Sequence, residues 1–286
     1  MPIAMTKRCR NRHDTAFLFC LLLVLVLTGC SADDPINISF ALTLDDSKLA
    51  MREMTNEPKP MKRPVIVLGG IYDPGVASGR VANRIRRLVE NNEQVISVTF
   101  LGQGTFDQCR NRVIACVEKA FPSDDPNQTV EVDVIGISMG GLVARHAAVP
   151  RSDGDKHLRI HRLFTISSPH RGAKMATLPT FDRLAIDMRF GSSFLATLDR
   201  QLVDLDYEIF PYTRLDDAIV GEENTAPWGQ NPWWVANIPG SFSHIFSMHD
   251  PRIMADICRH LRDETPYIAD PATPLPLATA PFFHAQ

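Results

Sequence analysis

The chain has 286 residues, of which 44% are hydrophobic and 22% are charged, and its formal net charge at pH 7 is −3. These proportions are ordinary for a globular protein. The slight excess of acid gives no basic field that would attract nucleic acid, so we expect no nucleic-acid partner.

The first 30 residues have the composition of a leader rather than of a fold. Basic residues precede an almost wholly apolar stretch at 16–27, which is too short to span a bilayer comfortably and fits the core of a signal peptide. The sequence LTGC at 27–30 resembles the lipobox of bacterial lipoproteins. This resemblance implies a signal peptide over 1–29 and a lipid on Cys30, and hence a membrane-anchored protein of the bacterial envelope. By the same resemblance, Ser31 rather than Asp after the cysteine implies the outer membrane. An uncleaved anchor and an ordinary signal with a chance cysteine are the alternatives.

The segments at either end of the body have little periodicity. We expect residues 30–63 to form a lipidated tether with one short strand at 36–44. Residues 264–286 are rich in Pro and Ala, and we expect a tail that is loose or strapped to the surface.

Residues 64–263 alternate between β-rich and helical patterns. Strands are predicted at 64–71, 94–101, 130–137, 160–167, 207–212 and 233–238, and helices at 81–89, 107–121, 139–148 and from about 250. Such alternation predicts an α/β fold with a mostly parallel central sheet and helices on both faces.

A possible nucleophile follows the strand predicted at 130–137. Gly136-Ile137-Ser138-Met139-Gly140 is a G-x-S-x-G sequence between a strand and a helix, which is the context of a nucleophile elbow. The serine needs a sharp turn with slim neighbours, and Gly136 and Gly140 meet that need. The alternative is a glycine-rich turn with no chemical role.

The strand predicted at 64–71 ends in Gly69-Gly70-Ile71. In α/β hydrolases the corresponding strand often ends in His-Gly, and the next backbone N–H is half of the oxyanion hole. By that resemblance Ile71 and Met139 supply the two N–H groups. Gly69 stands where the family usually has histidine, so the resemblance does not say which residue supports the loop. A plain glycine turn is the alternative.

The other partners of an activated serine should follow in the order acid, then histidine. Asp217 lies just after the strand predicted at 207–212, with Asp216 as the alternative. His244 precedes the last helix and is our predicted base. His249 is its rival, although a place near the helix cap with Asp250 suits it better.

Two further segments resemble the lipase-type branch of the α/β hydrolases: TISSPHRGA at 165–173 and RFGSSFLATL at 189–198. With the elbow, the resemblance covers residues 64–262. It implies an α/β-hydrolase fold with a small cap at about 174–206, a Ser138-Asp217-His244 triad, an acyl-enzyme and an ester or lipid-like substrate. It also implies that His170 and Arg171 support the wall of the site.

Several points remain open at this stage. The same triad would serve an acyltransferase, a thioesterase or an amidase, and a non-catalytic envelope scaffold is a further hypothesis. No Cys/His cluster has the spacing of a metal site and no loop resembles a phosphate cradle, so we expect no metal and no cofactor. Cys109 and Cys116 could pair only if Cys109 precedes its helix. The sequence does not indicate acyl length or oligomeric state.

Overall fold

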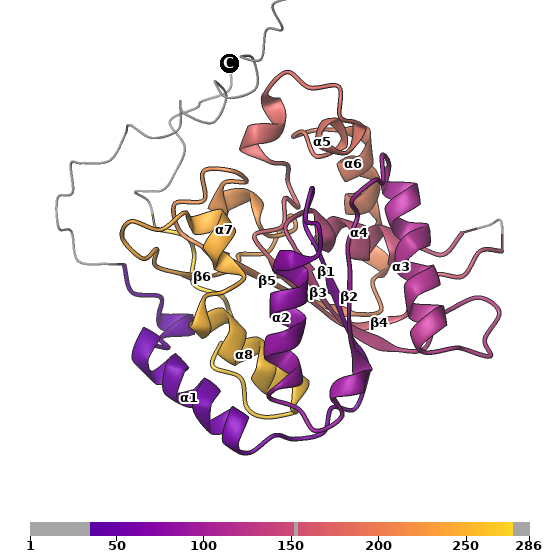
Figure 1. The fold of residues 1–286 in the computed structure, drawn as a ribbon. Coiled ribbons are helices and arrows are strands. Elements are labelled where there is room, and N and C mark those ends of the chain that lie inside the picture. Colours follow the sequence, from indigo (N-terminus) through magenta and orange to yellow (C-terminus); the bar gives the residue numbers. More distant parts are fainter. Residues whose placement is uncertain (1–34, 152–153, 277–286) are drawn as a thin grey trace, which may run out of the picture. The chain divides into compact units, whose positions relative to one another are not determined.

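A six-stranded, wholly parallel sheet forms the centre of the protein (Figure 1). The computed structural model describes residues 35–151 and 154–276. The strands are β1 (Val65–Leu68), β2 (Val95–Val98), β3 (Val132–Ile137), β4 (Ile160–Ile166), β5 (Glu208–Arg214) and β6 (Trp233–Val235), in the order β2-β1-β3-β4-β5-β6. The predicted α/β class and parallel sheet are confirmed, with each predicted strand of the body in its place.

The helices cover both faces of the sheet. Neighbouring residues of a strand point to opposite faces, and all four residues of β1 are buried, so both faces need to be covered. The longer helices are α1 (Leu44–Asn56), α2 (Val76–Arg86), α3 (Phe106–Ala120), α4 (Met139–Ala148), α6 (Ser193–Arg200) and α8 (Pro251–Leu261), and the short ones are α5 (Arg183–Asp187) and α7 (Ser243–Ser247). Val65 and Val67 pack with α1, α2 and α8, whereas Ile66 and Leu68 pack with α3 and α4. Two hydrophobic cores result, one on each face.

Single turns of 3-10 helix connect several of these elements. They are η1 (Ile38–Phe40), η2 (Asn92–Gln94), η3 (Lys174–Thr177), η4 (Gln201–Asp204) and η5 (Glu222–Asn224).

The segment before the body differs from our expectation. Residues 35–63 are not a tether, and no strand forms at 36–44, because the turn η1 covers 38–40 and α1 begins at Leu44. Thr43 caps the helix by accepting from the N–H of Asp46, and the buried side chains of Ala50 and Met54 pack against α8. The predicted signal peptide and Cys30 lie outside the described residues. Within those residues, no helix has the length and apolarity to cross a bilayer.

The described part of the tail is strapped to the body. The N–H of Ile268 donates to Asp256, and the indole N–H of Trp234 donates to the carbonyl of Thr273. The N–H of Thr273 in turn donates to the hydroxyl of Ser39. Both ends of the described chain therefore meet beside β6.

The cap consists of α5, α6 and the short turns beside them, over the carboxyl ends of the strands (Figure 1). Leu184, Leu195 and Leu198 are buried in the core that contains α3 and α4. Phe181, Phe190 and other apolar side chains of the segment stay exposed. The segment thus combines helix packing with an apolar outer surface.

Candidate active site

The chain turns sharply at Ser138, between β3 and α4. Ser138 has φ 52° and ψ −122°, which residues with a side chain rarely adopt. A Cβ on Gly140 would lie 2.5 Å from the carbonyl oxygen of Leu68, and one on Gly136 would lie 2.5 Å from the Cα of Gly141. Both separations are too short for real atoms, so the turn requires glycine at these two positions.

His244, in α7, joins Ser138 to Asp217. Its Nε2 lies 3.1 Å from the hydroxyl oxygen of Ser138, and its Nδ1 lies 2.8 Å from Asp217 Oδ2. Ser138 follows β3 directly, Asp217 lies just after β5 and His244 belongs to α7, yet the three form one continuous hydrogen-bonded chain. The structure therefore brings together the serine, acid and histidine that the sequence singled out.

Asp217 is buried, with 1% of its surface exposed. Burial acts to raise the pKa of its carboxyl, but the hydrogen bond with His244 and two backbone N–H donors outweigh burial and lower that pKa below its ordinary value. The donors are Ile219 and Val220, at 3.0 and 2.9 Å from Oδ1. Asp217 is thus held ionised, in the state that can orient an imidazole and stabilise its positive charge.

The two alternative residues lie elsewhere. Asp216 is exposed and accepts from the side-chain amide of Asn237 at 3.4 Å. His249 lines the same cavity as Ser138 but makes no hydrogen bond with it, and Asp250 rather than His249 caps α8. Burial, and after it Arg84 and Arg80, lowers the pKa of the His249 imidazole.

The predicted oxyanion groups lie beside Ser138. Gly70 passes so close that a Cβ on it would be 3.3 Å from the Cβ of Ser138, and Ile71 lines the cavity at this point. Met139 is the first residue of α4, where an N–H has no partner within the helix. Among the backbone hydrogen bonds of the described loops and turns, none uses the N–H of Ile71 or of Met139.

Asp73 supports the oxyanion loop and was missed in the sequence. Its carboxylate accepts from the N–H groups of Gly75, Ala77 and Ser78, at 2.9 to 3.1 Å. Burial opposes ionisation of this carboxyl, but these bonds prevail and lower its pKa. A Cβ on Gly69 would lie 2.7 Å from Asp73 Oδ2. Asp73 therefore fills the space that a histidine at position 69 would need.

A cavity of about 620 Å³ opens at Ser138 and His244. Its walls are mainly apolar and include Ile71, Ile137, Ala176, Met188, Val220 and Met248. Exposed apolar side chains stand at its rim, namely Tyr72, Val76, Met175 and Ile245. The Tyr72 hydroxyl donates to Asp182, the cap residue of α5, and so ties the rim to the cap.

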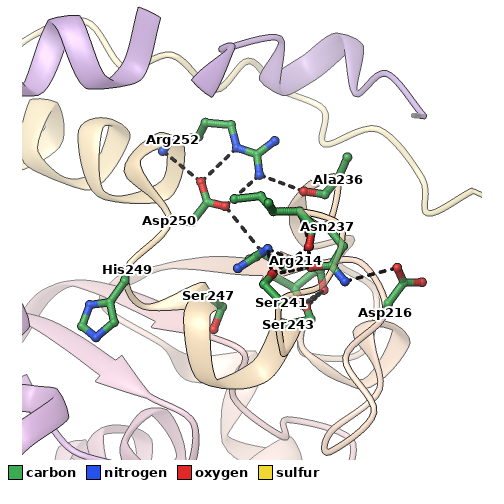
Figure 2. Close-up of polar contacts among 12 residues, drawn as sticks. Arg214, Asp216, Ala236, Asn237, Ser241, Ser243, Ser247, His249, Asp250 and Arg252 are labelled. Atoms are coloured by element: carbon green, nitrogen blue, oxygen red, sulfur yellow. Dashed lines mark hydrogen bonds and ion pairs between the residues drawn. The ribbon is translucent and has the colours of Figure 1, made fainter. Parts of the chain in front are cut away.

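A buried polar network supports the helix that carries His244 (Figure 2). Asp250 accepts from the guanidinium of Arg252 at 2.7 and 2.9 Å and lies 3.5 Å from Nε of Arg214. Arg214 also donates to Asn237 and Ser241. The network joins the ends of β5 and β6 to the start of α8, and α7 lies between them.

Two serines attach α7 to its surroundings. The hydroxyl of Ser243 donates to the carbonyl of Arg214 at 3.2 Å, and that of Ser247 donates to the carbonyl of His244 at 2.8 Å. Ser167, at the end of β4, donates to the Ser247 hydroxyl. The helix that carries His244 is therefore attached to the ends of two strands, β4 and β5.

His170 and Arg171 belong to the segment 169–173, of which Pro169 and Ala173 line the cavity. His170 is fully buried, with Nδ1 3.1 Å from Nη1 of Arg145 and Nε2 3.0 Å from the hydroxyl of Thr165. Burial, reinforced by Arg145, keeps its pKa well below the ordinary value, so the ring is neutral. Arg171 donates to the carbonyl of Glu223 in η5 and to those of Pro227 and Gln230 in the loop that follows.

Cys109 lies inside α3, and both Cys109 and Cys116 are free. The disulfide considered for this pair therefore does not form. Within the described residues, no group of three His, Cys, Asp or Glu side chains is arranged to hold a metal ion.

The sheet order, the elbow and the cap define an α/β-hydrolase fold. Residues 90–187 match the family described as the PGAP1-like alpha/beta domain, which belongs to the α/β-hydrolase superfamily. This stretch contains the elbow but ends before Asp217 and His244. No curated protein sequence matches the chain.

Solved structures resemble the chain at low identity. Phospholipase PlaB from Legionella pneumophila has 13% identity and a TM-score of 0.43, over 57% of this chain and 43% of its own length. The mature lipase BlEst2 from Bacillus licheniformis has 13% identity and a TM-score of 0.46, over 72% and 94%. The product of lin2722 from Listeria innocua has 13% identity and a TM-score of 0.48, over 71% and 95%. The chain thus spans less than half the length of the phospholipase.

Proposed function

We propose that this protein is a serine hydrolase that cleaves carboxylic esters. The observation that carries the proposal is the hydrogen-bonded chain from Ser138 through His244 to Asp217, at the floor of an apolar cavity. A serine hydroxyl is a weak nucleophile until a neighbouring base removes its proton, and a buried carboxylate keeps that base in the correct tautomer.

The reaction then proceeds in two halves. Nε2 of His244 takes the Ser138 proton while the hydroxyl oxygen attacks the ester carbonyl. The imidazolium, stabilised by Asp217, returns the proton to the departing alkoxide and an acyl-enzyme remains. Water, deprotonated by the same histidine, attacks the acyl carbonyl and releases the acid with Ser138 restored.

Negative charge develops on the carbonyl oxygen in both halves. The N–H groups of Ile71 and Met139 are the proposed donors, since both border Ser138 and neither is used in a backbone bond of the described loops. Donors fixed in advance by Asp73 and by the start of α4 need no rearrangement during the reaction.

The apolar walls support an acyl or other lipid-like group as the part of the substrate that enters the cavity. We further propose that the mature protein is attached to the bacterial envelope, at the outer membrane, by a lipid on Cys30. The basis for this attachment is the lipobox at 27–30.

The test uses the chain that starts at Ser31, because the described body, residues 35–151 and 154–276, forms a compact unit of its own. We expect a fluorophosphonate probe to label the wild type and to label neither Ser138→Ala nor His244→Ala. A series of p-nitrophenyl esters of rising acyl length then defines the chain that fits. Absence of label on folded wild-type protein contradicts the proposal, and products formed on added alcohols or amines would indicate an acyltransferase instead.

A further inference from the structure

A basic groove lies beside the proposed catalytic cavity. It has a volume of about 420 Å³ and is lined from α1 by Lys48 and Arg52, from the end of α2 by Arg84 and Arg87, and from the other side by His249. No Asp or Glu is among its lining residues. The protein has a net charge of −3, but the positive charge gathered at this groove attracts anions locally.

These cations are poorly neutralised within the protein. Lys48 pairs with Asp45 at 3.0 Å, but within the described residues no carboxylate forms an ion pair with Arg52, Arg84 or Arg87. Lys48 and Arg52 are four residues apart on α1, a spacing at which like charges repel and destabilise a helix. The arrangement has a stability cost that a bound anion would offset.

The groove and the catalytic cavity share a wall. His249 lines both, and Arg80, one turn before Arg84 on α2, lines the mouth of the cavity. Positions 80, 84 and 87 follow one face of the helix. The cations of α2 therefore form a row from Arg80, which lines the cavity, to Arg84 and Arg87, which line the groove.

We infer that this groove binds a phosphate on the alcohol side of the ester while the acyl chain occupies the apolar cavity. The inference rests on the proposed function and narrows its substrate class to phosphorylated acyl esters. Guanidinium groups suit this ligand, because their planar N–H donors match two phosphate oxygens at once. Arg84 is held ready by donation from Nη1 to the carbonyl of His249 at 3.2 Å.

The first test compares two soluble substrates with the same acyl chain, octanoylglycerol and octanoylglycerol 3-phosphate, with the chain that starts at Ser31. At low ionic strength we expect the KM of the phosphorylated ester to be roughly tenfold lower, and salt to reduce the difference. Inorganic phosphate should compete with the phosphorylated ester only.

The variant R52Q/R87Q removes two charges, and neither side chain has a described hydrogen bond to lose. We expect it to abolish the KM preference and to leave the kcat and KM of octanoylglycerol unchanged. The control K119Q/R159Q removes two exposed charges, one from α3 and one directly before β4, where Arg159 pairs with Glu131 at 3.2 Å, and it should keep the preference. A preference that is absent, survives in R52Q/R87Q or is lost equally in the control overturns the inference.

Two further measurements separate the possible failures. Calorimetry of octyl phosphate binding to Ser138→Ala tests the groove without any turnover. When R52Q/R87Q is combined with Ser138→Ala, the affinity for octyl phosphate should fall roughly tenfold. If octyl phosphate binds in this way but neither ester is cleaved by the wild type, the proposed function fails and the groove stands. If R52Q/R87Q weakens binding only to phosphatidylglycerol vesicles and not to the soluble phosphates, the groove recognises a bilayer surface and the substrate assignment is wrong.

Discussion

Asp250 is the residue on which the support of α7 most depends. It is 2% exposed and is the only carboxylate in described contact with two buried guanidinium groups, those of Arg214 and Arg252. Asp250→Asn leaves both cations in place with no counter-charge, and removal of one partner from a buried ion pair costs about 3–5 kcal/mol. Asp250 also caps α8, because its side-chain oxygen accepts from the N–H of Arg252. Asp250→Ala removes this cap as well and should cost about 1 kcal/mol more.

Urea unfolding followed by both fluorescence and circular dichroism measures these losses and tests for two-state behaviour. Asp45→Asn is the control, because Asp45 also pairs with a cation but is almost fully exposed, and we expect no measurable change. At urea concentrations below its unfolding transition, Asp250→Asn should also have a lower kcat, because the helix of His244 is held through the bond from Ser243 to Arg214. A loss of stability below about 1 kcal/mol would refute the view that Asp250 balances the two cations.

Three other changes test the site directly. Asp217→Asn should lower kcat by about 10³- to 10⁴-fold with little effect on KM, measured on a p-nitrophenyl ester. Asp73→Asn should lower the free energy of unfolding by about 1 kcal/mol at pH 7. The pKa of Asp73 in the folded protein lies below the unfolded value of about 3.9, so its stabilisation is present above that pH and is lost as the pH falls through the folded pKa. The urea midpoints of wild type and variant should therefore converge at low pH. Gly140→Ala should prevent stable folding, as its Cβ meets Leu68, whereas Gly79→Ala in α2 meets nothing within 4 Å and should stabilise by about 0.5–1 kcal/mol.

The sheet and the elbow could be predicted because their signals are local. A buried parallel strand is a continuous apolar run, and VDVIGI at 132–137 is such a run followed directly by Ser138-Met139-Gly140. The glycines needed by the turn stand beside the serine in the chain. The order of acid and histidine along the chain then limited the choice to a few residues.

Features that depend on distant contacts could not be found in this way. The helix α1 buries few apolar side chains, mainly Ala50 and Met54, so its periodicity is weak and its stability comes from α8, some 200 residues later. Arg214 and Asp250 each resemble ordinary surface residues in the sequence. Only the fold shows that they are buried against each other.

Backbone strain marks the carboxyl edge of the sheet independently of any motif. Among the described residues, the non-glycine residues with positive φ are Tyr72, Ser138, Ser167, Asp216 and Asp263. The first four each follow the end of a strand by at most four residues, after β1, β3, β4 and β5. Strained residues persist only where the surrounding structure fixes them, and they concentrate at functional sites. The same edge holds the cavity and the Ser138–His244–Asp217 chain.

Asp216 offers a test that separates strain from chemistry, since it was the alternative acid. Its φ of 62° favours glycine, and its side chain makes one long hydrogen bond, to Asn237 at 3.4 Å. In Asp216→Gly, relief of roughly 1 kcal/mol of strain should nearly balance the greater freedom of glycine in the unfolded chain, so stability should stay within about 1 kcal/mol of wild type. The kcat for ester hydrolysis should also stay within about twofold of wild type, because of the two aspartates only Asp217 has a described hydrogen bond with His244. A large fall in kcat for Asp216→Gly, with Asp217→Asn still active, would assign the acid to Asp216 and reverse our choice between the two.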